Sequence, residues 1–183
     1  VIITGDVTLR LQNALKKGEL IGLSWRRLQT ESQELNLELA YPFLLNSPIG
    51  TDFNFNFFRR DSSFVELNLK LGLRYILKQN DYFSIFFSNN SSSVLRENIN
   101  IADAAADFST QSFGIAYQKE KLDYRFNPTR GHQIYASIGF GSNKINRNPR
   151  VDDAFYENII LTTDEYNLEL NSSFYLPAFK IAT

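Results

Sequence analysis

The chain contains no cysteine and no methionine, and it has a single histidine and a single tryptophan. The lack of cysteine excludes disulfides, thiolate nucleophiles and cysteine-ligated zinc, but it leaves the cellular compartment open. Nowhere do about 18 consecutive apolar residues occur, so the sequence encodes no transmembrane helix. The net charge of −1 provides no basic face of the kind that nucleic acid requires.

What the chain does have is length and aromatic side chains. Its 183 residues suffice for one domain, and they include 16 Phe and 9 Tyr. No boundary divides residues 1–183, so we expect a single domain. The first residues, Val1 to Thr4, are too short for a signal peptide, and if the protein is exported its signal lies upstream.

Apolar and polar residues alternate with a period of two along most of the chain. In residues 65–75, for example, Val65, Leu67 and Leu69 fall on one side of a strand, and Glu66 and Asn68 fall on the other. A helix would scatter these residues around its circumference. The pattern predicts nine β-strands, at residues 7–15, 20–28, 34–41, 52–57, 65–75, 82–88, 113–118, 133–141 and 167–174.

The connections between the predicted strands alternate in length. Short turns fall on one side of an up-and-down sheet, and the other side holds growing loops, the longest being polar runs at residues 89–107 and 142–165. Residues 98–107 could form a short helix within the first of these loops. Four prolines lie clearly in connections, and Pro42 ends a strand, as its missing backbone donor requires.

Two all-β architectures fit the alternation. A soluble sandwich or lipocalin-like barrel would bury the apolar side chains inside. Three features favour an antiparallel transmembrane β-barrel instead: strands of roughly 9 to 11 residues, short and long connections on opposite sides, and charges in the middle of the polar face. We expect these charges to face a wet lumen; they are Arg10, Arg26, Glu38, Glu66, Lys70 and Arg74.

Several aromatic residues near predicted strand ends suit the membrane interface, where amphipathic rings settle at headgroup level, although ordinary packing explains any one of them as well. They are Trp25, Tyr41, Tyr75, Tyr82, Tyr117 and Tyr175.

The stretch YRFNPTRGH, residues 124–132, connects two alternating runs. Pro128 fixes φ and Gly131 permits a backbone conformation that other residues resist, so the stretch predicts a rigid turn that sets the register of the next strand. The pattern D-x-x-x-x-P-T-x-G, followed by an alternating strand, resembles the barrel of the BamA/TamA outer-membrane assembly superfamily. The residues that carry this resemblance are Asp123, Asn127, Pro128, Thr129 and Gly131.

The resemblance extends along most of the chain. NALKKGELIGLSW resembles an early hairpin of that family, LELAYPFLLNSPIGTDFNF a strand ending at a proline before a tight turn, and EYNLELNSSFYLPAF a middle strand closing with Y-x-P. The resemblance implies a sixteen-stranded barrel, of which the nine strands correspond to roughly the second to the tenth. The periplasmic POTRA domains, the closing strands and the inward loop with its Arg-Gly motif do not fall within residues 1–183.

The sequence offers no clear catalytic site or cofactor motif. His132 has no obvious triad, Ser91 to Ser93 lack a G-x-S-x-G setting and are expected in a solvated loop, and Gly139-Phe140-Gly141 falls within a predicted strand. The acidic pairs Asp152-Asp153 and Asp164-Glu165 could bind calcium, but solvation is the default. We therefore expect neither an enzyme nor a bound cofactor in this segment.

The resemblance implies a protein integral to the bacterial outer membrane that helps insert or export other outer-membrane proteins. Its partners would be membrane lipid, client proteins and accessory assembly subunits, with no nucleic acid. The alternatives are a passive pore or adhesin whose loops bind ligand, the barrel of a family member fused to a patatin-like hydrolase, and a soluble lipid-binding barrel.

Overall fold

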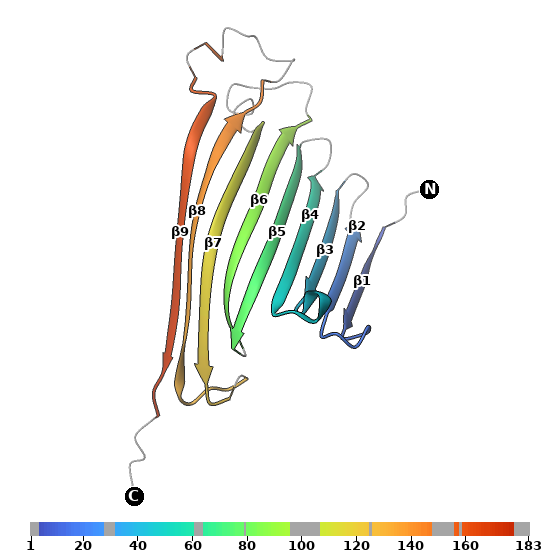
Figure 1. The fold of residues 1–183 in the computed structure, drawn as a ribbon. Helices are drawn as coiled ribbons and strands as arrows, with labels where there is room; N and C mark the ends of the chain where they lie inside the picture. The colour runs from blue at the N-terminus through green and yellow to red at the C-terminus, as the bar shows by residue number, and fades with distance from the viewer. Residues whose placement is uncertain are drawn as a thin grey trace, which may run out of the picture.

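The computed structural model of the protein describes residues 4–27, 32–60, 64–78, 80–95, 107–124, 126–147, 156–157 and 159–177. These residues form nine antiparallel strands in one open sheet, in sequence order from β1 to β9 (Figure 1). The strands are β1 (Gly5–Gln12), β2 (Leu20–Arg27), β3 (Gln33–Tyr41), β4 (Ile49–Arg60), β5 (Phe64–Lys78), β6 (Asp81–Val94), β7 (Phe108–Leu122), β8 (Gly131–Ile145) and β9 (Thr162–Tyr175). A single 3-10 turn, η1 (Leu44–Asn46), precedes β4.

The prediction of nine antiparallel strands is confirmed, and each observed strand overlaps the predicted one, although several strand ends differ. Every strand pairs with the next one along the chain, so β1 and β9 form the two edges of the sheet. Four short connections gather at one end of the sheet, which we call the short-turn end: residues 13–19, 42–48, 79–80 and 123–130. At the opposite end, which we call the loop end, β2, β4, β6 and β8 end and β3, β5, β7 and β9 begin.

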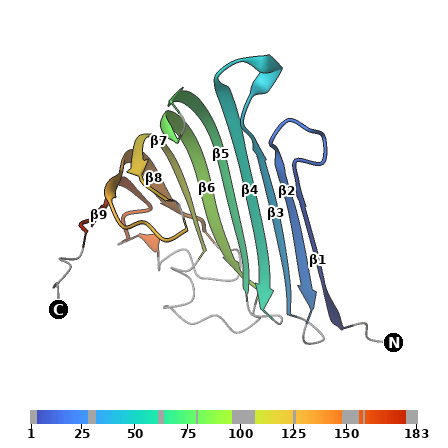
Figure 2. The same cartoon turned by 90° about the horizontal axis from the view of Figure 1, so that it is seen from below.

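The sheet is curved, and its two faces differ in chemistry. Figure 2 shows β1 to β5 side by side and β6 to β9 bending round to give the sheet a hollow side. The hollow side is the polar one, because polar side chains from β3 at one side and β9 at the other line a single depression. We call this side the concave face and the opposite, apolar side the convex face.

Antiparallel pairing carries the alternation across the sheet in rows. Leu11, Ile21, Leu39 and Phe53 face the same way on β1 to β4, because each is the register partner of the next, and Leu71 on β5 continues the row. Exposed apolar side chains cover the convex face; they are Val7, Leu9, Leu11, Leu39, Leu71, Leu73, Tyr75, Phe83, Ile85, Phe113, Ile115, Ile138, Phe140, Tyr166, Leu168, Leu170 and Phe174.

This sheet has almost no internal core. Among the hydrophobic side chains of the described residues, only Ala116 and Tyr156 are buried. The apolar surface that normally drives folding by leaving water is instead turned outward along the convex face. Within the described part of the chain, no helix is long and apolar enough to cross a membrane.

Two predicted loops begin later than the sequence indicated. The polar run that begins at Asn89 continues β6 to Val94, and the run from Ser142 contains the end of β8 and the start of β9 at Thr162. At the start of the first run, β6 and β7 are joined by polar side chains: Ser109 Oγ donates to Asn89 Oδ1 at 3.3 Å, and the hydroxyl of Ser88, just before the run, lies 2.7 Å from that of Ser112. Ser91 to Ser93 thus lie in β6 rather than in a loop, which corrects the prediction for them.

The first strand ends earlier than predicted. β1 stops at Gln12, and Leu15 lies exposed in the turn. The reason is local, because Asn13 and Lys16 adopt left-handed backbone conformations that no strand contains. The possible helix at residues 98–107 falls, except for Asp107, outside the described residues.

Candidate functional site: the polar concave face

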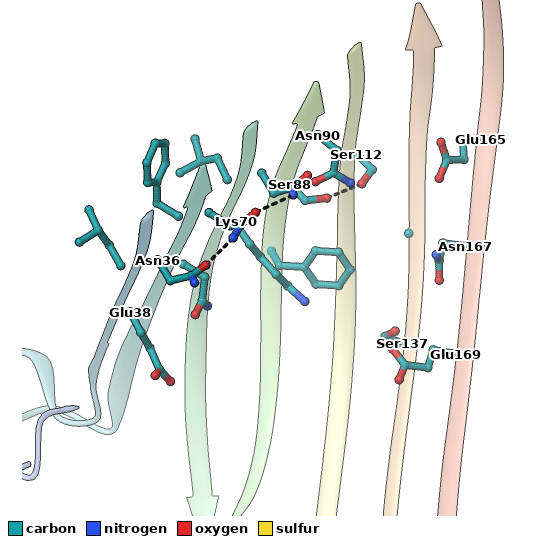
Figure 3. A pocket seen from close by; sticks show the side chains of 18 of the residues that line it. Asn36, Glu38, Lys70, Ser88, Asn90, Ser112, Ser137, Glu165, Asn167 and Glu169 are labelled. Atoms are coloured by element: carbon teal, nitrogen blue, oxygen red, sulfur yellow. Dashed lines mark hydrogen bonds between the residues drawn. The ribbon is translucent and has the colours of Figure 1, made fainter. Parts of the chain in front are cut away.

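A polar depression of about 560 Å³ runs across the concave face (Figure 3). It is lined by strands that lie far apart in sequence, from β3 to β9. The labelled side chains in Figure 3 are Asn36, Glu38, Lys70, Ser88, Asn90, Ser112, Ser137, Glu165, Asn167 and Glu169. Amides, hydroxyls and charges therefore line this surface, where a soluble β-barrel would carry its apolar core.

A row of asparagines forms a ladder across four strands. Asn36, Asn56, Asn68 and Asn90 lie opposite one another on β3, β4, β5 and β6. Asn68 Nδ2 donates to Asn56 Oδ1 at 3.2 Å, and Asn56 Nδ2 donates in turn to Asn36 Oδ1. Because each amide can donate and accept, the ladder satisfies polar groups side by side on one face. It ties β3, β4 and β5 together without apolar packing.

The six charges expected to face a lumen all lie on the concave face. Arg10 and Glu38 lie on either side of Gly22 in one row, and Arg26 lies directly opposite Glu34 in another. Lys70 lies opposite Asn54, Arg74 opposite Gly50 and Glu66 opposite Phe58. Charges of both signs are thus interleaved on this face.

Arg74 and Lys70 each contact an aromatic ring on the concave face. Arg74 Nε lies 2.6 Å from Asp52 Oδ2, and its guanidinium lies over the ring of Tyr82 at 5.5 Å. Lys70 Nζ lies 4.9 Å from the centre of the Phe86 ring. Each cation therefore rests against an aromatic ring, and Arg74 also contacts a carboxylate, an arrangement that holds these long side chains against the wall. Tyr82 consequently lies on the concave face and faces away from the apolar side where a membrane-interface ring would sit.

Phe86 and Gly114 form a contact that the sequence analysis did not identify. Phe86 faces the polar side, where it lies opposite Gly72 on β5 and Gly114 on β7. A Cβ added to Gly114 would lie 2.3 Å from Phe86 Cζ and 2.5 Å from the carbonyl oxygen of Ile138. The ring therefore occupies the space that a side chain at position 114 would need. The sequence does carry a signal for this contact, because Phe86 is out of phase with the apolar pattern of its strand and the neighbouring strands place glycines opposite it.

The turn between β7 and β8 is organised around one carboxylate. Asp123 Oδ1 accepts hydrogen bonds from the backbone N–H groups of Tyr124, Thr129 and Arg130, at 2.9, 3.0 and 3.0 Å. Asp123 Oδ2 accepts from the Thr129 hydroxyl at 2.5 Å. Gly131 then begins β8 with φ +128°, and a Cβ there would lie 2.0 Å from the carbonyl oxygen of Lys121. Asn127 and Pro128 lie in the same turn, between Asp123 and Gly131.

These hydrogen bonds stabilise the charged form of Asp123. The Thr129 hydroxyl and then the backbone N–H groups lower the pKa of the Asp123 carboxyl from 3.8 to about 2. A carboxylate whose pKa is lowered by folding stabilises the folded state at any pH above its ordinary, unfolded pKa. This stability is lost as the pH falls through the folded pKa. The turn is therefore expected to loosen between about pH 4 and about pH 2.

We predict that this loosening depends on Asp123. In the Asp123→Asn variant a neutral amide oxygen, a weaker acceptor than a carboxylate, faces the backbone N–H groups of Thr129 and Arg130. These N–H groups should therefore be less protected than in the wild type, and their protection should no longer depend on this carboxyl's titration. Hydrogen exchange of those two amides, followed from pH 5 to pH 2, measures the effect. Thr129→Ser keeps the hydroxyl and serves as the control. Equal pH dependence in the wild type and in Asp123→Asn would contradict this account of the turn.

The remaining residues singled out by sequence are not brought together. His132 lies at the start of β8, with its ring 6.4 Å from that of Phe174. Asp164 and Glu165 are neighbours on β9 and therefore point to opposite faces, which separates their carboxylates. Gly139, Phe140 and Gly141 lie within β8, as predicted. Asp152 and Asp153 fall outside the described residues.

Comparison of the chain with known protein families, with curated proteins and with solved structures found no match.

Proposed function

We propose that the chain forms part of the wall of a bacterial outer-membrane β-barrel, with its convex face against lipid and its concave face lining the lumen. The observation that carries this proposal is the outward display of apolar side chains. Phe113, Ile115 and Leu168 are 65%, 59% and 81% exposed. Contiguous apolar patches of this extent are rare on soluble monomers and mark membrane or protein contact.

The direction of curvature favours a membrane barrel over a soluble one. A lipocalin-like barrel or a sandwich places its apolar side chains on the inner surface, where they form the core. Here the inner surface carries the asparagine ladder, Lys70 and Glu38, and the outer surface is apolar. This is the polar-in, apolar-out arrangement of outer-membrane barrels.

The height of the apolar zone fits a bilayer. On β5 the convex apolar positions run from Val65 to Tyr75, which corresponds to about 34 Å of strand at about 3.4 Å per residue. At a tilt of about 40°, this becomes about 26 Å of height, close to the apolar band of about 25 Å in such barrels.

The sheet would close through further strands of the same protein. β1 and β9 are edges, and a bilayer-spanning sheet requires every backbone group to be paired. The resemblance of the Asp123–Gly131 turn and its flanking strands to the BamA/TamA superfamily supports a barrel of sixteen strands. It also supports a role in inserting or exporting other outer-membrane proteins, which would be its clients, with accessory assembly subunits as further partners. In this role the Asp123 turn has an architectural task on the short-turn side.

A second function is favoured by the concave depression. Its polar lining, with Lys70 and Glu38 on either side of Asn54 and with Glu165 and Glu169 on β9, would also suit a passive pore or a barrel that binds a polar ligand. The two functions differ in what they do to a client. An assembly protein accelerates folding of another barrel, whereas a pore conducts ions without doing so.

Reconstitution of the full-length protein in liposomes tests the assembly role. An unfolded outer-membrane protein is added, and its folding is followed by protection from protease. Faster folding than in empty liposomes, at equal lipid and protein concentration, is expected. Ion conductance without faster folding would instead establish the pore, and the assembly role would be wrong.

A further inference from the structure

Two neighbouring turns at the short-turn end enclose a shallow hollow of about 650 Å³. The β1–β2 turn contributes Lys16 and Lys17, and the β3–β4 connection contributes Phe43, Asn46, Ser47 and Pro48. Lys17 Nζ lies 3.4 Å from Asn46 Oδ1 and so links the two turns. We propose that this hollow, which we call the lysine groove, binds the phosphate headgroup of an anionic phospholipid.

The lysine-bearing turn is ordered by its own hydrogen bonds. The Glu19 carboxylate accepts from the backbone N–H groups of Leu15 and Lys17, the latter at 3.1 Å. Asn13 Oδ1 accepts from Gly18 N at 2.8 Å, and Asn13 N donates to the carbonyl oxygen of Glu19 at 2.7 Å. Both lysines are therefore presented from a preformed loop, which lowers the ordering cost of binding an anion.

Glu19 does not compete with the anion for the two lysine ammonium groups. Its side chain is buried, and its carboxylate oxygens are occupied by the turn's backbone donors. No other acidic side chain is among the described residues that line the groove. The lining thus combines two exposed ammonium groups with apolar surface, which complements the charge of a phosphate diester and the chain attached to it.

The second turn supplies the apolar part. Leu45 is 91% exposed, and it is held in a left-handed conformation with φ +53°. Such a conformation is unfavourable for a leucine, and it persists here because Ser47 N and Ser47 Oγ both donate to the Leu44 carbonyl oxygen, at 2.9 and 2.6 Å. Phe43, two residues before Leu45, is also exposed and lines the groove. An exposed apolar turn beside two lysines is suited to the boundary between headgroups and acyl chains.

The groove lies at the depth where headgroups are expected. On β3 and β4, the convex apolar rows end at Tyr41 and Ile49, immediately before the turn that forms the groove. Tyrosine at the end of an apolar band is typical of the membrane interface. This inference rests on the proposed membrane location, because the groove would meet lipid only if the convex face is embedded.

Native mass spectrometry of the full-length protein in neutral detergent tests the proposal. The probe is short-chain phosphatidylglycerol, with phosphatidylcholine of the same chain length as the neutral comparison. The test variant is Lys16→Gln/Lys17→Gln, and the control is Lys78→Gln/Lys121→Gln, which removes the same charge from exposed lysines at the same end of the sheet. We expect the test variant to bind phosphatidylglycerol about thirtyfold more weakly, about fivefold for each lysine, and the control to bind it like the wild type.

Three outcomes would overturn the proposal: equal binding of both lipids by the wild type, equal losses in both double variants, or displacement of the lipid by an acidic peptide that itself binds more tightly. The last outcome would make the groove a protein-docking surface. Failure of the proposed membrane location is distinguishable from all three, since the wild type would then not enter lipid bilayers at all.

Discussion

Replacing Leu168 with arginine is expected to lower the free energy of unfolding of the membrane-embedded protein by about 2 to 4 kcal/mol. Leu168 lies on the convex face of β9, in the row that contains Ile85, Ile115 and Ile138. That row lies in the middle of the apolar zone, with apolar rows on both sides of it. In a bilayer a guanidinium at this depth loses its hydration, and this loss is the source of the expected cost.

The neighbouring residue provides a matched control. Asn167 is the previous residue of β9, it is exposed, and it faces the concave side, where it lines the polar depression. Asn167→Arg adds the same side chain to the same strand, so we expect it to change stability by less than about 1 kcal/mol. Denaturant unfolding of both variants of the full-length protein in lipid vesicles gives the comparison. Equal losses at the two positions would contradict the assignment of the faces.

Gly114→Ala is expected to cost about 1 to 3 kcal/mol, a large effect for one methyl group. The added carbon would lie 2.3 Å from Phe86 Cζ and 2.5 Å from the Ile138 carbonyl oxygen. The ring can rotate away, but the carbonyl oxygen belongs to the paired backbone of β8. The strain must therefore be relieved by moving β7 against β8.

Gly139→Ala is the matched control for this prediction. Gly139 lies opposite Gly114 in the same row, but a Cβ there would have no heavy atom closer than 3.7 Å, which is ordinary contact. The urea midpoint of each variant measures the difference. In the double variant Gly114→Ala/Phe86→Ala only part of the loss should be recovered, because the Ile138 contact remains. A Gly114→Ala protein as stable as Gly139→Ala would show that the close contacts of Gly114 with Phe86 and with the Ile138 carbonyl do not constrain the sheet.

The faces of the sheet could be predicted because a period of two has only one interpretation in an up-and-down sheet. Once Leu35, Leu37 and Leu39 share a side, antiparallel pairing with Phe57, Phe55 and Phe53 keeps the whole row on that side. The nine strands and the common face of Arg10, Lys70 and Arg74 followed directly from this pattern.

Strand ends and special contacts could not be read in the same way. The alternation stops at Asn89, yet β6 continues to Val94, because backbone pairing needs no apolar side chain. Leu15 kept the apolar phase of β1, but the left-handed Asn13 had already ended the strand. The Phe86–Gly114 contact joins residues that are 28 positions apart in sequence, and only the register of β6 against β7 brings them together.

Trp25 tests the central claim most directly. It is the only tryptophan in the chain and lies on the convex face of β2, in the row of Val7 and Leu35. The full-length protein, with any tryptophan outside residues 1–183 replaced by phenylalanine, is inserted into vesicles of lipids with brominated acyl chains. The account predicts strong quenching of Trp25 fluorescence by these lipids and little quenching by aqueous iodide. Strong quenching by iodide, with none by the brominated lipids, would place the convex face in water and contradict it.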